Sequence, residues 1–370
     1  MMEVTMSMIR IPVDLVMEFM RKSLQAAGVP EEDANIVADV LIRSDVRGIE
    51  SHGIGRLKMY LDFIRDKVQN PVTTFEILRE SPGTALVDGH FGMGHVISFR
   101  AMQLAIKKAH AVGIGAVAVK NSTHFGIAGY YPLMAVKESM AGFAVTNARP
   151  SIAPTFGSEP MLGTNPIAFG VPTDEECPFL LDMATSITQR GKIEVAVRAG
   201  KSVPSGWAID NQGDGMADPL RILQAFASGQ ASLLPLGGKG EETAGYKGYG
   251  LAVMVEILSA VLSGGPWCWG VSGFDEDGNK APNCLGHFFL AIDIAKFVDV
   301  QEFKKSAGAL VRSLRNVRKL PGQERIYSAG EKEYENEKII PRIGVPINDS
   351  LQKTMREIKR EYDLSIDLPF

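Results

Sequence analysis

The stretch GIGAVAVKNSTHFGIAGYYPLMAVKESMAGFAVTN (residues 113–147) decides the fold class. Residues 115–120 and 142–146 are short apolar runs next to glycine, a pattern typical of buried strands. Residues 128–138 lie between these runs and have the apolar spacing of a helix. A strand, a helix and a second strand in succession predict an α/β fold.

The regions on both sides of this stretch continue the alternation of strands and helices. Short apolar runs predict further strands at residues 166–171, 179–183 and 287–292. Helical spacing predicts further helices at residues 95–111, 191–199 and 246–262. The middle of the chain is therefore expected to be one α/β unit.

The two ends of the chain are expected to be helical and to differ from the glycine-rich middle. Of the 38 glycines, 30 lie between residues 81 and 295, and glycine concentrates where the backbone turns tightly. Apolar periodicity predicts N-terminal helices at residues 12–27, 30–46 and 52–64. We expect a mostly helical domain from residues 1–75, joined by about 300–370, and an α/β domain from residues 76–299.

The composition argues against nucleic acid and membrane partners. The chain of 370 residues is 45% hydrophobic and 22% charged, with a net charge of −4, and it lacks the clustered Lys and Arg of a phosphate-binding surface. The longest apolar stretch, residues 251–265, is too short to span a bilayer and contains Glu256. The N-terminal stretch MMEVTMSMIRIPVDLV lacks the pattern of a signal peptide. We expect a cytoplasmic protein.

Neither a disulfide framework nor a metal centre is expected. The three cysteines, Cys177, Cys268 and Cys284, are far apart and form no CxxC motif. The six histidines form no HExxH pair. His90, His95, His110 and His287 have no suggestive neighbours in the sequence, and we interpret them as structural.

The familiar nucleotide-binding motifs are absent. GHFGMGH (residues 89–95) has its glycines in the wrong order for a dinucleotide-binding turn, and the segment from Gly240 to Lys247 is not a P-loop. PLGGKGEETAGYKGYG nevertheless leads into the expected helix at 246–262 with Lys239 and Lys247 close by. A helix N-terminus with free N–H groups can bind an anion or pyrophosphate; the alternative is a mobile surface loop with solvated lysines.

Two histidines lie in segments that suit chemistry. His52 follows Ser51 and precedes Arg56 by four residues, so a helix that starts here would place both on one face. Histidine titrates near neutral pH and arginine holds carboxylates bidentately, which suits proton transfer on an anionic substrate. His124 lies in a loop between a strand and a helix, a frequent ligand position in α/β folds. For both, a helix cap beside an incidental histidine is the alternative.

Two further segments end or begin strands. Asp182 comes at the end of the apolar run PFLLD, where a carboxylate can bind ribose hydroxyls, orient a histidine or cap a turn. Gly163-Thr164-Asn165-Pro166 is typical of a tight turn into a strand. The same turn can line a pocket.

Together these segments resemble one family over almost the whole chain, the type 2 malate/L-lactate dehydrogenases. This family of NAD(P)-dependent oxidoreductases includes sulfolactate and ureidoglycolate dehydrogenases and related reductases. Any one motif is weak, but nine in order are specific. The matching stretches are SHGxxR (51–56), NSTHFGIAGYY (121–131), GTNPIAFGVP (163–172), LDMATS (181–186), RGKIEVA (190–196), LPLGG (234–238), GYKGYGLA (245–252), GHFFLAID (286–293) and LPGQE (320–324).

The resemblance implies a fold and a set of site residues. It implies a non-Rossmann NAD(P)-binding α/β domain beside a mostly helical domain, in a homodimer with sites near the subunit interface. It implies His52 and His124 as the candidates for proton transfer, with Asp182 as a helper that orients a ring. The expected substrate-binding residues are Ser51, Arg56, Thr164 and Asn165. The expected cofactor-binding residues are Asp182, Met183, Ala184, Thr185, Ser186, Tyr246, Lys247, Gly322, Gln323 and Glu324.

The resemblance also implies the reaction. Hydride would pass between NAD or NADP and a small 2-hydroxy acid, with malate and oxaloacetate favoured by the Arg-Gly-Lys run at 190–192. Alternatives are L-lactate, sulfolactate or ureidoglycolate oxidation, an imine or keto-sugar reductase on the same fold, and a non-catalytic nucleotide-binding protein. Arg149 stands where relatives commonly carry a small or polar residue, and it is expected either to reach a ligand or to lie on the surface.

Overall fold

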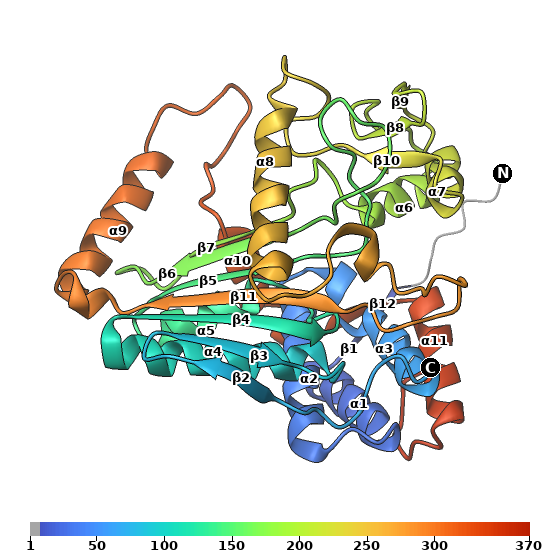
Figure 1. The fold of residues 1–370 in the computed structure, drawn as a ribbon, viewed down its shortest axis with the longest axis horizontal. Helices are drawn as coiled ribbons and strands as arrows, with labels where there is room; N and C mark the ends of the chain where they lie inside the picture. Colours follow the sequence, from blue (N-terminus) through green and yellow to red (C-terminus); the bar gives the residue numbers. More distant parts are fainter. Residues whose placement is uncertain (1–7) are drawn as a thin grey trace.

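The computed structural model describes residues 8–370 and is centred on a seven-stranded mixed sheet (Figure 1). The strand order is β2 (Glu76–Glu80), β3 (Thr84–Asp88), β4 (Ile114–Ser122), β11 (Leu285–Ile292), β5 (Ala141–Thr146), β6 (Ile167–Val171) and β7 (Phe179–Met183). Only β3 and β4 are parallel among these neighbours, because α4 crosses between them. The α/β prediction is confirmed, and all five strands expected from the sequence lie in this sheet.

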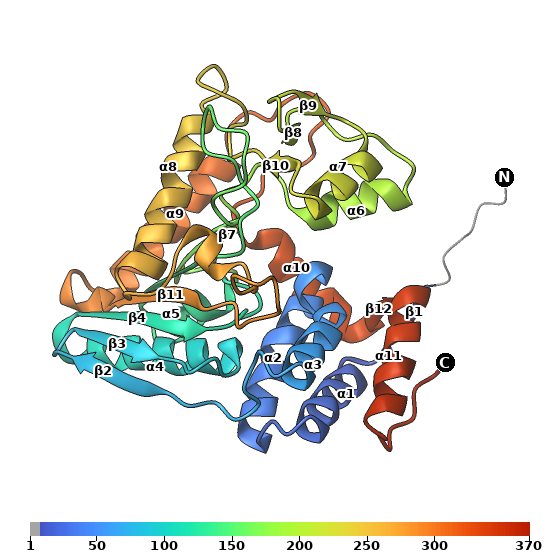
Figure 2. The same cartoon turned by 45° about the vertical axis from the view of Figure 1, so that its right-hand side comes forward.

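Helices cover both faces of the sheet (Figure 2). On one face, α4 (Gly94–Val112) and α5 (Tyr130–Lys137) pack on alternate strand residues such as Val117, Val119 and Phe289. On the other face, Val145 and Ile167 pack against Val255 of α8 (Gly245–Glu256). The helix expected at 246–262 is present and continues beyond α8 as a π-helical turn, Ile257–Val261.

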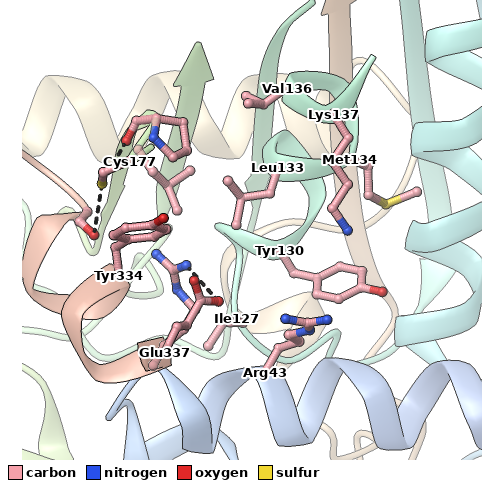
Figure 3. A pocket seen from close by; sticks show the side chains of 14 residues that line it. Arg43, Ile127, Tyr130, Leu133, Met134, Val136, Lys137, Cys177, Tyr334 and Glu337 are labelled. Carbon is pink, nitrogen blue, oxygen red and sulfur yellow. Dashed lines mark hydrogen bonds and ion pairs between the residues drawn. The ribbon is translucent and has the colours of Figure 1, made fainter. Parts of the chain in front are cut away.

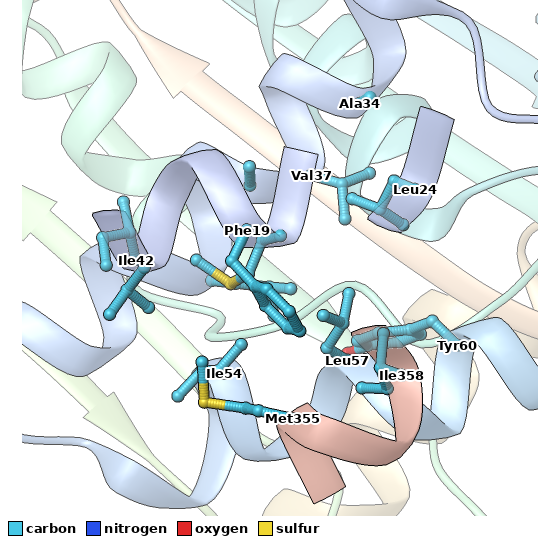
Figure 4. Packing of buried hydrophobic residues seen from close by; sticks show 14 of the residues in the cluster. Phe19, Leu24, Ala34, Val37, Ile42, Ile54, Leu57, Tyr60, Met355 and Ile358 are labelled. Atoms are coloured by element: carbon cyan, nitrogen blue, oxygen red, sulfur yellow. The ribbon is translucent and has the colours of Figure 1, made fainter. Parts of the chain in front are cut away.

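The N-terminal and C-terminal segments share a second hydrophobic core (Figure 4). Phe19 and Leu24 of α1 (Val13–Ala26) and Leu57 pack with Met355 and Ile358, which lie in the C-terminal helix. The helices around this core are α2 (Glu31–Val46), α3 (Leu57–Arg65) and α11 (Asp349–Glu361), with the antiparallel pair β1 (Met8–Ile11) and β12 (Val345–Asn348) at its edge. This burial of apolar side chains stabilises the contact between the two chain ends.

The other two C-terminal helices contact different parts of the fold. Arg312 of α9 (Val300–Arg315) forms a salt bridge with Asp174, in the turn between β6 and β7. Glu337 of α10 (Glu331–Ile343) pairs with Arg47 next to α2. The domain limits near residues 75 and 300 stay a prediction.

A smaller unit lies beyond the edge of the main sheet (Figure 1). It consists of a three-stranded sheet, β10 (Ala231–Leu233), β8 (Ala208–Asp210) and β9 (Gly215–Met216), with α6 (Arg190–Arg198) and α7 (Pro219–Ala227). Of these elements, only α6 was expected from the sequence. The strands have two or three residues each, which is too short for a periodic pattern.

The prediction of one helix from 52 to 64 is wrong at its start. Two short 3₁₀ turns, Glu50–His52 and Ile54–Arg56, precede α3, which begins only at Leu57. Between them Gly53 has ψ −143°, outside the helical region, and the N–H of Ile54 is bound by a carboxylate of α2 instead of a preceding carbonyl.

No helix in the described part of the chain is both long and apolar enough to cross a membrane. The first seven residues of the stretch MMEVTMSMIRIPVDLV, on which the signal-peptide prediction rests, lie outside the described residues.

Candidate active site

The segment that carries Ser51 and His52 is anchored by Asp45, at the end of α2. Asp45 is buried, and its Oδ2 accepts a hydrogen bond from the N–H of Ile54 at 2.8 Å. Its other oxygen lies against Gly53, where a Cβ would be only 1.8 Å from Oδ1. Glycine is therefore required at position 53 by close packing, and the carboxylate fixes the path of the chain on both sides of His52.

Arg56 stays close to His52 although the two do not share a helix. The Nε of Arg56 donates to the backbone oxygen of Ser51 at 2.7 Å, which draws the guanidinium back towards the histidine turn. The two terminal amino groups of Arg56 have no partner among the described residues. The guanidinium can therefore still offer a bidentate contact to a carboxylate.

The rings of His52 and His124 come together in the folded chain. They stack with centroids 5.4 Å apart and an angle of 21° between the planes. Nδ1 of His52 is hydrogen-bonded to Ser51 Oγ at 2.8 Å, and Nδ1 of His124 is bonded to the hydroxyl of Tyr60 at 2.7 Å. Both Nε2 atoms have no hydrogen-bond partner in residues 8–370.

Two histidines interpreted as structural lie around this pair. His287 of β11 is buried, with Ser122 and Thr146 hydroxyls bound to its two ring nitrogens at 2.8 and 2.7 Å. His95 of α4 is also buried, meets the Tyr60 ring edge to face at 4.7 Å, and has no partner on either nitrogen. This clustering was not predictable from the sequence, because the contacting residues lie in five separate elements, namely β4, β5, β11, α3 and α4.

The surroundings keep the site histidines uncharged at neutral pH. Removal from water and, to a smaller extent, the positive charge of Arg56 lower the pKa of His52 to about 4. Burial and the neighbouring histidines lower the pKa of His124 well below its usual value. A carboxylate bound to Arg56 would cancel part of this positive field and so favour proton uptake by His52.

Tyr60 and Asp45 were also not singled out in the sequence. Tyr60 follows Arg56 by four residues on α3, a spacing that could have indicated it. Asp45 is the first residue of the loop DVRGIESHGIGR. Burial raises the pKa of Asp45 to about 7, partly offset by the Ile54 hydrogen bond.

Asp182 of β7 does not touch either ring of the histidine pair. Its Oδ2 accepts the N–H of Gly129, at the start of α5, at 2.7 Å. Asp182 is exposed as a residue, but partial removal of its carboxylate from water raises its pKa to about 6, an effect that the hydrogen bond from Gly129 partly offsets. Among the described residues no hydrogen bond joins Asp182 to His52 or His124. Its second oxygen is available to a ligand.

The cofactor segment predicted at residues 182–186 packs against the loop that leads into α8. The N–H of Leu236 donates to the oxygen of Thr185 at 2.8 Å, and Ser186 forms a bridge with Pro235. Gly248, in the first turn of α8, packs on Leu236 so closely that a Cβ would be 2.2 Å from its oxygen. The structure therefore places Thr185 and Ser186 beside the same loop that precedes Tyr246 and Lys247.

The N-terminus of α8 keeps the features expected of an anion site. Its N-cap, Ala244, provides no side-chain hydrogen bond, so the N–H groups at the very start of the helix stay available, although that of Lys247 already donates to the oxygen of Ala244. The side chains of Tyr246 and Lys247 are exposed, and they lie near each other with the ammonium 5.8 Å from the ring centre. A cavity of about 290 Å³ adjoins the preceding loop between Leu234 and Gly240.

Asn165 is committed to a buried network rather than to an open pocket. Its amide donates to the oxygen of Ala252 at 2.9 Å and to Oε2 of Glu256 at 2.7 Å. Glu256 also accepts from Asn147 and from the N–H of Cys268. Both amide hydrogens of Asn165 are thus in use, whereas the hydroxyl of the half-buried Thr164 has no partner among the described residues.

Two further predicted elements form no hydrogen bond with His52 or His124 in residues 8–370. Gly322, Gln323 and Glu324 are exposed in the loop between α9 and α10. Their hydrogen bonds within residues 8–370 are local: Gln323 with Leu320, and Glu324 with Lys319. Arg149 is exposed with its guanidinium 5.5 Å from the Phe274 ring. Contact of either with a ligand stays a prediction.

A separate pocket lies between α2, α5 and α10 (Figure 3). Apolar side chains such as Ile127 and Leu133 line it, together with Arg43, Tyr130 and Tyr334. None of the predicted site residues is in its lining. We therefore assign the chemistry to the histidine pair and not to this pocket.

The chain is similar to known proteins over nearly its whole length. Residues 11–356 match the family model described as malate/L-lactate dehydrogenase. The chain is 46% identical to a malate dehydrogenase of Pyrococcus horikoshii, over 95% of each chain. It is 40% identical to an L-sulfolactate dehydrogenase of Methanocaldococcus jannaschii, over 93% of this chain and 94% of the relative.

A solved structure shows the same fold. The malate dehydrogenase of Entamoeba histolytica has a TM-score of 0.94 and 44% sequence identity, and the match covers 98% of this chain and 100% of that one. The family match, the two relatives and this structure all span nearly the whole sequence. The chain therefore belongs to the malate/L-lactate dehydrogenase family.

Proposed function

We propose that this chain is an oxidoreductase that transfers a hydride between NAD or NADP and a small 2-hydroxy acid, with malate and oxaloacetate as the substrate pair. The observation that carries the proposal is the stacked pair His52 and His124 beside Arg56. Free Nε2 atoms and a guanidinium with two unused amino groups form a binding site for the oxygen and carboxylate of a 2-hydroxy acid. The names of the relatives favour malate.

The site residues divide the work on the substrate. Arg56 binds the C1 carboxylate, which fixes the angle at which C2 faces the hydride acceptor. Nε2 of His52 or of His124 takes the hydroxyl proton as the C2 carbonyl forms, and returns it in the reverse direction. We favour His52 as this base because Arg56 would hold the carboxylate beside it. Ser51 orients the ring through its 2.8 Å hydrogen bond to Nδ1.

The residues present fit a dinucleotide cofactor. The uncapped start of α8 and the exposed Lys247 suit a pyrophosphate, and the open carboxylate of Asp182 suits ribose hydroxyls. Met183 to Ser186 would line the path between them. When bound, the nicotinamide accepts the hydride from C2 or gives it back. Relatives with names that specify NADP(+) and NAD(+) both occur, so both are retained.

The proposal also covers the division into domains and the oligomeric state. We assign the N-terminal and C-terminal helices around the core of Figure 4 to one domain, and the seven-stranded sheet to a cofactor-binding domain of non-Rossmann type. We also propose a homodimer, in which Gly322 to Glu324 complete a cofactor site. Light scattering should give about twice the chain mass of 40.1 kDa; a monomer at micromolar concentration would contradict this assembly.

A substrate panel tests the proposed reaction. Oxidation of NADH and of NADPH is measured with oxaloacetate, pyruvate, sulfopyruvate and 2-ketoglutarate. We expect the highest kcat/KM with oxaloacetate. Preference for sulfopyruvate would place the chain with the sulfolactate dehydrogenases. Cofactor binding without turnover of any 2-keto acid would instead indicate a non-catalytic nucleotide-binding protein.

A further inference from the structure

The side chain of Tyr60 is hydrogen-bonded to the ring of His124. Its side chain is buried in the helical core, and its hydroxyl lies 2.7 Å from Nδ1 of His124. The N–H of Gly126 also points at the same nitrogen, at 3.4 Å. A backbone N–H can only donate, so Nδ1 must act as an acceptor in this arrangement.

The hydroxyl of Tyr60 must then donate as well. A neutral imidazole has one protonated and one bare nitrogen, and the bare nitrogen is here Nδ1. Burial raises the pKa of Tyr60 above its usual value, so the phenol keeps its proton at neutral pH. The ring proton of His124 is therefore on Nε2, the nitrogen that has no partner within the described residues.

The packing around Tyr60 offers its hydroxyl no second hydrogen-bond partner in residues 8–370. Its ring and that of His95, also buried, meet edge to face with centroids 4.7 Å apart. His124 Nδ1 is the one hydrogen-bond partner of the Tyr60 hydroxyl in residues 8–370. A buried hydroxyl that loses its partner is costly, so the pair Tyr60–His124 is expected to persist.

We propose that Tyr60 is a positioning residue that holds His124 as the Nε2–H tautomer, so that His124 donates a hydrogen bond to the substrate oxygen while His52 carries the proton. The proposal rests on the proposed function and assigns the two histidines different tasks within it. An Nε2 that already carries a hydrogen cannot take up the hydroxyl proton of a 2-hydroxy acid. It can stabilise the negative charge that develops on that oxygen.

The tautomer can be measured without turnover. Protein labelled with ¹⁵N-histidine is examined by long-range ¹H–¹⁵N NMR, with His124→Asn used to assign the ring. In the wild-type chain at pH 7.5 we expect a bare Nδ1 and a protonated Nε2 for His124. A protonated Nδ1 in the wild-type chain would overturn the proposal, whether or not the enzyme turns over oxaloacetate.

Tyr60→Phe tests the cause, and Tyr131→Phe is its matched control. The Tyr131 hydroxyl is also buried but donates to the backbone oxygen of Phe125, so its loss should leave the His124 tautomer and kcat unchanged. For Tyr60→Phe we expect a mixture of His124 tautomers and a kcat lower by about three- to tenfold, the factor that corresponds to one neutral hydrogen bond. The KM for NADH should not change.

The outcomes separate the positioning role from a structural one and from the proposed function. A Tyr60→Phe protein that folds with unchanged His124 shifts and unchanged kcat would overturn the proposal. Equal losses in Tyr60→Phe and Tyr131→Phe, without a tautomer change, would do the same. If the wild-type chain shows the expected tautomer but reduces no 2-keto acid, the proposed function fails, and with it the task assigned to His124.

Discussion

The rings of His52 and His124 lie 5.4 Å apart and nearly parallel, which joins two segments that are distant in the sequence into one site. His52 is in a 3₁₀ turn after α2, and His124 comes two residues after the end of β4, an interior strand of the main sheet. The contact between the helical ends of the chain and the α/β part therefore assembles the proposed site. Salt bridge Arg100–Asp33 and hydrogen bond Tyr130–Asp39 hold α4 and α5 to α2 close by.

The first prediction concerns proton transfer by the histidine pair. His52→Ala should lower kcat by about 10²–10⁴-fold, the usual contribution of general acid–base catalysis. It should also remove the acid limb of the pH–kcat profile for malate oxidation, because the unprotonated ring is the base. His124→Ala should lower kcat but keep that limb. The assignment is reversed if the limb disappears with His124→Ala and remains with His52→Ala.

The second prediction concerns recognition of the carboxylate by Arg56. Arg56→Lys should raise the KM for oxaloacetate far more than the KM for NADH, since an ammonium cannot reproduce the bidentate guanidinium contact. The expected loss in kcat/KM corresponds to about 2–4 kcal/mol. Steady-state kinetics with each substrate varied in turn provides the measurement. Equal effects on both KM values would show that Arg56 supports the fold and not the substrate.

The third prediction concerns the close packing of Gly53 on Asp45. Gly53→Ala would place a Cβ 1.8 Å from Asp45 Oδ1, so the chain around His52 must shift. We expect the free energy of unfolding to fall by about 1–3 kcal/mol and kcat to fall with it, measured by urea unfolding and by turnover.

Gly55→Ala is the matched control for this prediction. Gly55 is exposed, and the nearest atom to an added Cβ is 3.8 Å away. Both stability and kcat should therefore stay close to the wild-type values. Similar effects of the two substitutions would rule out Asp45 packing as the reason for glycine at position 53.

The fourth prediction concerns stability in acid. Burial lowers the pKa of both His95 and His287 to about 3, while an unfolded histidine titrates near 6.5. As the pH falls below 6.5, the unfolded chain takes up protons first, so this part of the stability is present above 6.5 and is lost progressively down to about pH 3. At pH 5 the loss is about 2 kcal/mol for each buried ring.

Buried carboxylates with raised pKa values have the opposite effect on stability, which they increase as the pH falls. Asp45, with a pKa of about 7, favours the folded state as the pH falls, and so offsets part of the histidine effect. His287→Gln should reduce the loss of unfolding free energy between pH 7.5 and 5, measured in urea, whereas a substitution at the exposed His110 should not. An unchanged pH dependence in His287→Gln would contradict the prediction.

Much of the fold was readable from the sequence because the main elements are long and periodic. The strands at 142–146 and 179–183 and the helices after Pro12 and Pro30 lie where their apolar spacing placed them. β2 was missed because all five of its residues are exposed, so no buried face marks it. The start of α3 was misplaced because Asp45, a tertiary partner, interrupts the helix at Gly53.

Residues of the candidate site could be predicted only where their type and local motif pointed to chemistry. His52, Arg56 and His124 stood out by residue type and local motif. His287 did not, since Ser122 and Thr146 reach it only after β4, β11 and β5 pair in register. Asn165 was interpreted as a pocket residue. Its hydrogen-bond partner Glu256 instead belongs to α8, which covers the face of the sheet opposite α4 and α5. Such pairings depend on tertiary structure.

Transfer of a labelled hydride tests the central claim most directly. The chain is incubated with NAD or NADP and malate that carries deuterium at C2, and the reduced cofactor is analysed by mass spectrometry and by NMR at nicotinamide C4. The account predicts that the deuterium arrives at C4, that Arg56→Lys slows its transfer, and that no label appears in the solvent. A reduced cofactor without deuterium, or no reduction with either cofactor, would contradict hydride transfer from C2 at this site.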